Sequence, residues 1–315
     1  MIAARLACAI IGLAAGTRAI SIATADTAAA LPKFTVSQVA AGVFVHLGQP
    51  LALDAPGHDD IANIGFIVGN RCVAVIDTGG SVRIGRALRA AVAVHTRQPI
   101  CYVINTHVHV DHVLGNVVFK DGRARFVGHS ALPAALARSR LYFMTQFGGD
   151  LDQPPSADQV VPPDRIVADT LELDLGDRPL HLRAWPIAHT DCDLTVLDER
   201  TGTLWTGDLL FRERLPAVDG DVAGWLQVDN ELARLEVQRV VPGHGPLSTD
   251  LAAALQPEQR YLRALLSDVR SELDGGESLQ QAIQHAADSE RPHWLLWDST
   301  HPRNVTRVYQ QLEWQ

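Results

Sequence analysis

The sequence predicts one large domain that mixes strands and helices, of the α/β or α+β class. A strand, an amphipathic helix and a second strand follow one another between residues 72 and 104. Residues 171–205 are dense in strand patterns, whereas the residues after 250 show helical spacing of apolar side chains. No linker or repeat divides the chain, and its 47% hydrophobic residues suffice for a sizeable core.

Residues 1–25 are typical of a secretory signal. Arg5 precedes an apolar stretch from Leu6 to Ala15, and Ala23-Thr24-Ala25 fits the small-x-small cleavage pattern. The apolar stretch is too short for a membrane span. We therefore expect an exported, periplasmic protein, and the alternative is a frayed hydrophobic N-terminus.

The net charge limits the classes of partner, and the cysteine count limits which disulfides the chain can form. The net charge of −9 argues against a nucleic-acid partner, which requires a basic face. Beyond the expected signal the cysteines are Cys72, Cys101 and Cys192, so at least one has no partner within the chain. Cys72 and Cys101 lie at similar distances before the ends of two strands that we expect to pair in parallel. We expect them to lie close together, and a disulfide requires a Cα separation within about 7 Å.

The first strands are expected at residues 43–47, 64–68 and 72–77, and the last two form a hairpin around Gly69-Asn70. Ser81 is placed to cap a helix that runs to about His95. The next strand, residues 100–104, completes a strand–helix–strand unit, which makes a parallel pair. The C-terminal ends of parallel strands lie at one edge of a sheet, so we expect Asp77 and His107 to lie together.

Three histidines and an aspartate follow that strand within residues 107–112. Because side chains alternate along a strand, His107 and His109 point the same way off its end. Asp111 and His112 follow where the chain must turn. Neutral imidazole and carboxylate are common zinc ligands, so the cluster offers two ligands to one metal and two to another.

This cluster resembles the His-x-His-x-Asp-His motif of the metallo-β-lactamase superfamily. Further matches follow in the expected order: His189 in Ala188-His189-Thr190, Asp208 in Thr206-Gly207-Asp208, and His244 in Pro242-Gly243-His244-Gly245. The similarity runs from about Phe34 to Leu247. It implies an α+β fold, an αββα four-layer sandwich over residues 34–250, with residues 251–315 as a helical extension packed on it.

The resemblance also implies a ligand set and a chemistry. One metal would lie on His107, His109 and His189, and a second on Asp111, His112 and His244, with Asp208 bridging the two. Two Zn²⁺ ions, with iron as an alternative, would activate a bridging hydroxide that attacks an ester, thioester, lactone or related bond of a small molecule. Asp111 would orient this nucleophile or accept its proton. Asp77 would support the histidine loop from behind or, equally, cap the following helix.

The segments 75–80, 190–193 and 204–211 are most similar to the quinoprotein relay system zinc metallohydrolases, SoxH-like periplasmic proteins. Dizinc β-lactamases usually lack the carboxylate that stands here as Asp208, which makes lactam hydrolysis less favoured. The resemblance implies a periplasmic quinoprotein or cytochrome partner in a PQQ-dependent dehydrogenase system. Two alternatives stay open: an iron-dependent oxidoreductase of sulfur compounds and a non-catalytic metal-binding accessory protein.

The second half alternates strand and turn patterns. Strands are expected at residues 171–175, 180–184, 195–198, 203–205 and 239–241, a short helix at 231–237, and further helices over 262–273, 279–286 and 305–312. Residues 51–60 and 147–163 are expected to be loops, the first over the metal site in related proteins and the second a candidate lid. His58, His129 and Cys192 are expected outside the ligand set. Arg212 and Arg214 either face solvent or meet an anionic substrate.

Overall fold

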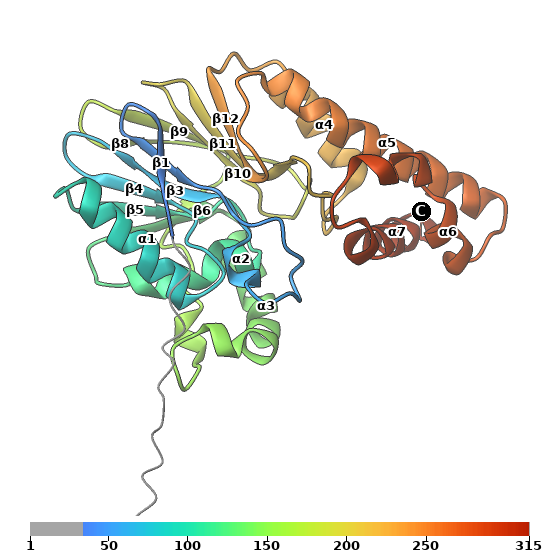
Figure 1. Cartoon of the computed structure of the whole chain (residues 1–315), viewed down its shortest axis with the longest axis horizontal. Coiled ribbons are helices and arrows are strands. Elements are labelled where there is room, and N and C mark those ends of the chain that lie inside the picture. The colour runs from blue at the N-terminus through green and yellow to red at the C-terminus, as the bar shows by residue number, and fades with distance from the viewer. Residues whose placement is uncertain (1–33, 315) are drawn as a thin grey trace, which may run out of the picture. The chain divides into compact units, whose positions relative to one another are not determined.

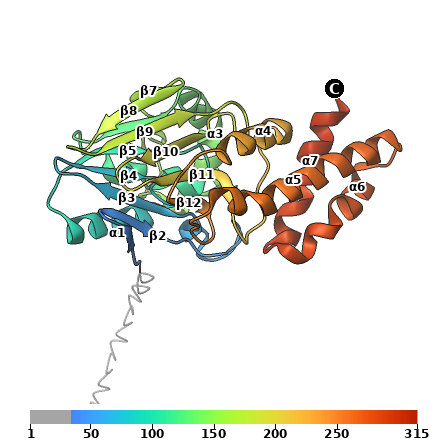
Figure 2. The same cartoon turned by 90° about the horizontal axis from the view of Figure 1, so that it is seen from above.

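Two β-sheets face one another in the computed structural model, which describes residues 34–314 (Figures 1 and 2). The expected signal segment, residues 1–25, lies outside this range. The first sheet has the order β1-β2-β3-β4-β5-β6-β7 and the second has the order β12-β11-β10-β9-β8. Helices cover the outer face of each sheet, so the expected αββα sandwich is confirmed.

The strands of the first sheet are β1 (Ser37–Ala40), β2 (Val43–His46), β3 (Ile64–Val68), β4 (Val73–Ile76), β5 (Ile100–Ile104), β6 (Arg125–His129) and β7 (Arg165–Val167). Those of the second sheet are β8 (Thr170–Asp174), β9 (Pro179–Ala184), β10 (Leu194–Asp198), β11 (Thr203–Phe211) and β12 (Arg239–His244). The hairpin β3–β4 is antiparallel, and β4, β5, β6 and β7 are parallel, as is the pair β11–β12.

The helices are α1 (Val82–His95), α2 (Val110–Val113), α3 (Leu132–Gln146), α4 (Val222–Leu232), α5 (Leu251–Asp274), α6 (Leu279–His285) and α7 (Trp297–Glu313). Short 3₁₀ turns lie at His58–Asp60, Leu114–Phe119, Gly148–Asp150, Ala157–Gln159 and Asp288–His293. The loop expected over residues 147–163 therefore contains two such turns. None of the helices described is long and apolar enough to cross a membrane.

The strand–helix–strand unit forms as its sequence predicts. The Ser81 hydroxyl accepts a hydrogen bond from the backbone N–H of Ile84 at 3.0 Å, which caps α1. In the parallel pair β4–β5, Ile76 lies opposite Ile104. The residues that follow these two, Asp77 and Asn105, therefore emerge at the same edge of the sheet, where the site is built.

Cys72 and Cys101 form a disulfide, with a Cα separation of 5.7 Å. The expected proximity of these two residues is confirmed. A register irregularity follows Val73, which pairs with Ile100, whereas Ala74 pairs with Tyr102. Cys101 thus lies in a bulge beside the start of β4, and this local geometry brings the sulfurs together.

The short helix predicted at residues 231–237 is wrong. The helix of this region is α4, which ends at Leu232, and it begins after Asp221, whose carboxylate accepts from the Gly224 N–H at 2.7 Å. Its buried positions Val222, Trp225, Val228, Asp229 and Leu232 follow helical spacing. The glycines at 220 and 224 obscure this pattern, because glycine normally indicates a turn.

The hydrophobic core has one layer between the two sheets and one layer on the outer face of each sheet. Between the sheets, Trp205 of β11 packs with buried aliphatic residues such as Ile76 and Leu182. The outer face of the first sheet packs against α1 through Ile84 and Leu88. The outer face of the second sheet packs against α4 and α5, and α7 joins the same core by packing on α5, in the helical group beside the sheets in Figure 1.

Candidate metal centre

The predicted ligand side chains converge at one edge of the sandwich. His107, His109, Asp111 and His112 follow β5, His189 follows β9, Asp208 lies within β11, and His244 ends β12. They form two groups whose ligand atoms lie within 4.8 Å of one another: His107, His109, His189 and Asp208, and Asp111, His112 and His244. This is the division that the sequence predicts, and it is consistent with a dinuclear metal site.

Asp208 lies between the two groups. Its Oδ2 is 3.4 Å from His189 Nε2 and 3.3 Å from His244 Nε2, and its Oδ1 is 3.1 Å from His112 Nε2. Both carboxylate oxygens therefore face imidazole nitrogens, and those nitrogens belong to both groups. A carboxylate in this position would contact both ions of a dinuclear site.

Each of the five imidazoles uses one ring nitrogen outside the centre. The contacts are His107 Nδ1 with Thr106 Oγ1 at 3.0 Å, His109 Nε2 with Asp219 Oδ2 at 2.6 Å, His112 Nδ1 with Asp77 Oδ2 at 2.8 Å, His189 Nδ1 with the Ala217 carbonyl at 2.8 Å, and His244 Nδ1 with the Ile61 carbonyl at 2.8 Å. An acceptor at the outer nitrogen fixes the proton there. The inner nitrogen then presents a lone pair to the centre, as metal-binding histidines do.

Several inner atoms have no protein partner. Among the residues described, His107 Nε2, His112 Nε2 and Asp208 Oδ1 are inaccessible to solvent and make no hydrogen bond. A buried polar atom left in this state costs about 1–3 kcal/mol. Lone pairs of several imidazoles and two carboxylates thus face one another, an arrangement that cations would satisfy. The donor set of nitrogen and oxygen suits zinc.

Burial keeps part of the imidazole set neutral. Burial, with His109 nearby, lowers the pKa of His189 to about 3. Burial and His112 hold the pKa of His107 well below its ordinary value. At His112 burial also lowers the pKa, but Asp208, Asp111 and Asp77 outweigh it and the pKa rises well above its ordinary value. A metal ion between these carboxylates would compete with that proton.

Asp77 supports two of these histidines from behind. Its Oδ1 accepts from the Thr106 N–H at 2.8 Å, and its Oδ2 accepts from the Thr106 hydroxyl at 2.7 Å and from His112 Nδ1 at 2.8 Å. The Thr106 oxygen in turn accepts from His107 Nδ1. Asp77 has φ 54°, a left-handed conformation that costs a non-glycine residue about 1–2 kcal/mol. Of the two roles considered for it, the contacts are those of support for the histidine loop, because Ser81 caps α1.

Two glycines make room for Asp208. Gly207 has φ 52°, and a Cβ there would lie 2.5 Å from the Thr106 Cβ. A Cβ on Gly243 would lie 1.9 Å from Asp208 Oδ1. Glycine at 207 therefore lets β11 approach Thr106 beyond the end of β5, and glycine at 243 leaves room for the Asp208 carboxylate between β11 and β12.

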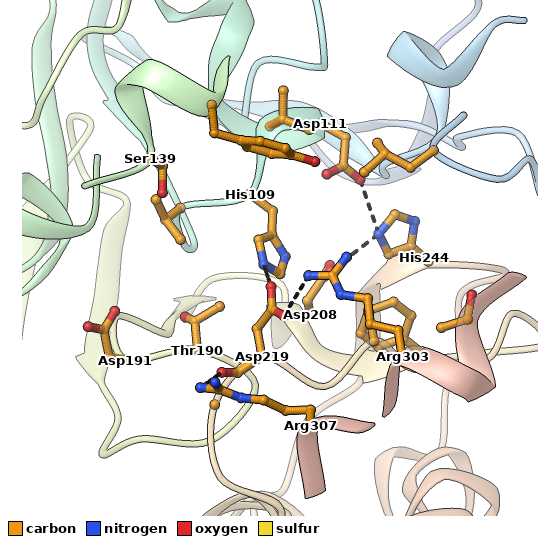
Figure 3. A pocket seen from close by; sticks show the side chains of 18 of the residues that line it. His109, Asp111, Ser139, Thr190, Asp191, Asp208, Asp219, His244, Arg303 and Arg307 are labelled. Atoms are coloured by element: carbon orange, nitrogen blue, oxygen red, sulfur yellow. Dashed lines mark hydrogen bonds and ion pairs between the residues drawn. The ribbon is translucent and has the colours of Figure 1, made fainter. Parts of the chain in front are cut away.

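A cavity of about 1050 Å³ opens onto the centre (Figure 3). Its apolar wall includes Leu53, Tyr142, Phe143 and Ile187, and its polar wall includes the arginines 138, 214, 303 and 307. The loop 51–60 lines the cavity, as expected. The loop 147–163 does not, so its predicted role as a lid is not supported; it meets the first loop through His58 Nε2 and Asp150 Oδ2 at 3.0 Å.

The residues expected outside the ligand set do lie outside it. His129 bonds to the Trp185 carbonyl at 3.2 Å, and burial lowers its pKa. Cys192 is buried and not in a disulfide, and burial raises the pKa of its thiol. Arg212 donates to the Pro246 carbonyl at 2.7 Å, whereas Arg214 lines the cavity.

The sequence does not identify Asp219, Thr106 or the carbonyl of Ala217 as partners of the histidines. Asp219 lies before a glycine in a Pro-Ala-Val-Asp-Gly segment, which indicates only a turn. Thr106 is adjacent to the motif and could have been found from its position. Backbone carbonyls carry no sequence signal.

The family model described as the metallo-beta-lactamase superfamily matches residues 58–244, more than half of the chain. No curated protein matches the sequence. The fold is similar to that of the stereoselective inverting sec-alkylsulfatase Pisa1 from Pseudomonas sp., with a TM-score of 0.68 and 16% identity over 88% of this chain and 50% of that one. It is also similar to a metallo-beta-lactamase from Pontibacter korlensis, with a TM-score of 0.60 and 17% identity over 73% and 99%.

The chain spans about half the length of the alkylsulfatase structures that it matches. At these identities the structural matches establish the fold alone. The alkylsulfatase match covers a larger share of this chain than the β-lactamase match does.

Proposed function

The chain belongs to the metallo-β-lactamase superfamily, and we propose that it is a dinuclear zinc hydrolase of an ester, thioester, lactone or related bond in a small molecule. It has the intact His/Asp site of a metallohydrolase of this fold. The observation that carries the proposal is the pair of ligand groups that meet at Asp208, in which His107 Nε2, His112 Nε2 and Asp208 Oδ1 have no hydrogen bond among the described residues.

In this proposal His107, His109 and His189 hold one ion and Asp111, His112 and His244 hold the other, with Asp208 shared. Two bound Zn²⁺ ions would supply Lewis acidity and a water that ionises near neutral pH. The outer contacts of the histidines fix the directions of the inner lone pairs before any ion binds. The protein thus contributes a preorganised set of ligands.

Asp111 is the proposed proton acceptor. It lines the cavity, and its Oδ2 is 3.4 Å from His244 Nε2 and 3.6 Å from His112 Nε2. Burial raises the pKa of Asp111, but His112 and His244 outweigh burial, and the net shift is downward. The carboxylate is therefore ionised at neutral pH, as a residue that orients water and accepts its proton must be.

Hydrolysis of a sulfate ester is the second candidate, because the Arg214 guanidinium lines the cavity beside the metal centre and can meet an anion there. Among the described residues, no carboxylate forms an ion pair with Arg214, and its contact at 3.2 Å is with His244 Nδ1. That nitrogen already donates its proton to Ile61, so it cannot accept from the guanidinium. An alkylsulfatase shares the fold over most of this chain, so the fold is compatible with this substrate class, and Arg214 is the observation that favours it.

The proposed location is the periplasm, and the proposed setting is that of the quinoprotein relay system zinc metallohydrolases. The Cys72–Cys101 disulfide supports an oxidising compartment, since disulfides are rare in the cytosol. The link to a quinoprotein or cytochrome partner rests on the sequence segments alone.

Initial rates on a panel test both candidates. The panel contains p-nitrophenyl acetate, an acyl thioester, a lactone, p-nitrophenyl sulfate and a secondary alkyl sulfate, each with zinc-loaded protein. Asp111→Asn should lower turnover of the accepted class at least about 100-fold. Asp164→Asn, at an exposed ion pair with Arg125, is the matched control and should change nothing. Absence of turnover on every member would overturn the hydrolase proposal.

Arg214→Gln separates the two candidates. If the substrate is anionic, this variant lowers kcat/KM for the sulfate esters and leaves the neutral esters unchanged. Equal loss on neutral and anionic substrates would instead assign Arg214 a role in holding His244. Full activity on both classes would remove the sulfate-ester candidate.

A further inference from the structure

Polar side chains on one face of helix α7 form hydrogen bonds and an ion pair with one short segment of the chain, residues 216–220. Arg303 donates to Asp219 Oδ1 at 2.6 Å, Arg307 donates to the Asp219 carbonyl at 2.6 Å, and Gln311 donates to the Gly220 carbonyl at 2.5 Å. These three donors are spaced four residues apart, so they lie along one face of the helix. Figure 3 shows Asp219 between His109 and this arginine face.

Asn304 adds a buried contact to the same segment. Its amide donates to the Pro216 carbonyl at 2.7 Å, and its oxygen accepts from the Val218 N–H at 2.9 Å. Asn304 is fully buried, so these bonds are shielded from water. The segment is therefore held at Pro216, Val218, Asp219 and Gly220, all from one helix.

The same segment holds two histidines of the centre. The Asp219 carboxylate accepts from His109 Nε2 at 2.6 Å, and the Ala217 carbonyl accepts from His189 Nδ1 at 2.8 Å. The backbone N–H of Gly220 also donates to the His189 carbonyl at 2.7 Å. The outer partners of His109 and His189 thus both come from the segment that α7 fixes.

We propose that α7 is a positioning element of the metal centre, which sets His109 and His189 through residues 216–220. Asp219 is the link, because one carboxylate oxygen meets Arg303 and the other meets His109. Loss of the arginines would free the carboxylate to rotate toward solvent. His109 Nε2 would then lose its fixed acceptor, and the inward Nδ1 lone pair would lose its fixed direction.

Different residues of α7 contact residues 216–220 and pack in the hydrophobic core. Its apolar face, with Val305 and Val308, packs into the core shared with α4 and α5. Arg303 and Arg307 are exposed, so their replacement leaves that core intact. Variants at these two positions can therefore test positioning without unfolding the extension.

The test compares zinc binding by full-length variants in competition with a chromophoric chelator. Asp219→Asn should weaken one zinc equivalent by about 10- to 100-fold. Arg303→Gln/Arg307→Gln should weaken the same equivalent by about threefold to tenfold, since each exposed contact contributes modestly. When Arg303 is replaced by Lys instead of Gln in the double variant, most of the lost zinc affinity should return, because the lysine keeps a cation beside Asp219. Arg291→Gln, at an exposed ion pair of the same extension, is the control and should bind as wild type does.

The triple variant Arg303→Gln/Arg307→Gln/Asp219→Asn decides whether the arginines act through Asp219. If they do, it binds zinc within about twofold of Asp219→Asn alone. The absorption spectrum of the cobalt-loaded arginine variant should also change, because the ligand field at His109 changes. The inference is overturned if the arginine variant binds both zinc ions as tightly as wild type. It is also overturned if the triple variant shows the full arginine effect on top of Asp219→Asn, or if only the melting temperature of metal-free protein falls.

Discussion

At the scale of single residues, Asp208 is the carboxylate of the centre that faces histidines of both groups. It is buried, and one of its oxygens has no hydrogen bond among the described residues. Burial raises its pKa, but His244, His112 and His107 outweigh burial, and the pKa falls well below its ordinary value. Asp208 is thus held as a carboxylate between two sets of ligands.

Asp208→Ala should lose or loosen one metal ion and abolish most turnover, while the fold survives, because the carboxylate contacts the ligand histidines and the substitution leaves the backbone pairing of β11 unchanged. Asp208→Cys should partly restore binding, since thiolate is a good zinc ligand. Zinc content and melting temperature check this together. Two tightly bound zinc ions with wild-type turnover in the Ala variant would remove Asp208 from the site.

Gly243→Ala should displace Asp208, because the added Cβ would lie 1.9 Å from Asp208 Oδ1 and 2.7 Å from the Gly207 carbonyl carbon. We expect one zinc ion to be lost, with a fall in stability of about 1–3 kcal/mol from the crowding. Gly149→Ala is the control, since a Cβ there meets nothing within 4 Å and Gly149 is not among the glycines with positive φ. Normal zinc content in the Gly243 variant contradicts the described geometry.

Some residues of the site could be predicted from the sequence, and others could not. Four of the expected ligands, His107, His109, Asp111 and His112, lie in one local motif, whereas His189, Asp208 and His244 were expected only from the resemblance to the family. Asp219 was not predicted, because its role depends on His109, 110 positions earlier, and on a helix more than 80 positions later. Only the tertiary structure brings these groups together.

At the scale of elements, the contact between α4 and α5 contains two buried acids. Within residues 34–314, neither carboxylate oxygen of Asp229 in α4 accepts a hydrogen bond. Glu258 of α5 uses one oxygen, which accepts from the Phe211 N–H at 2.8 Å. Burial raises the pKa of Asp229 well above its ordinary value, and burial and Asp229 do the same for Glu258. Both acids are thus held in their protonated forms.

Asp229→Asn should stabilise the protein, and more so at higher pH. The folded protein keeps the proton, whereas the unfolded chain releases it above about pH 4, so wild-type stability falls as pH rises from that point. The gain in unfolding free energy should be larger at pH 8 than at pH 5 by at least about 1 kcal/mol. Urea unfolding measures it, with the exposed Asp298→Asn as control. A gain that does not depend on pH would show that Asp229 is ionised in the folded state.

Element positions were predictable where a hydrophobic period was clear. The strand at 100–104 and the helix capped by Ser81 have strong signals, and both form as expected. Helix α4 was misplaced because glycines interrupt its pattern and its buried Asp229 breaks the apolar stripe. β11 runs six residues beyond the expected Trp205, since Gly207 and Asp208 do not resemble strand residues.

At the scale of the whole molecule, the disulfide closes the strand–helix–strand unit that carries Asp77 and the histidine motif. Cys72 and Cys101 are 29 positions apart, and a crosslink of this span stabilises by about 3 kcal/mol, with a wide range. Cys72→Ser/Cys101→Ser should lower the unfolding free energy by about that amount, and a reducing agent should do the same to wild type. Equal stability of oxidised and reduced wild type would contradict the bond.

The fold class could be predicted from the sequence, but the contacts between the C-terminal helices and the segment beside the metal centre could not. Alternating elements indicate α/β or α+β, and the sandwich follows from the resemblance of the motif segments. The helices after residue 250 were expected only as a packed cap. These helices contact residues 216–220 through polar side chains such as Arg303 and Gln311. The helical pattern of the sequence predicts that these side chains lie on the helix surface, but it does not predict which residues they contact.

The most direct test of the central claim is the metal content of the active full-length protein, measured per chain as zinc is restored to metal-free protein. We expect two ions to bind per chain, and we expect turnover of the accepted ester class to appear only when both ions are bound. Full turnover with one ion or none, or a chain that binds no more than one ion at saturation, would contradict a dinuclear centre shared across Asp208.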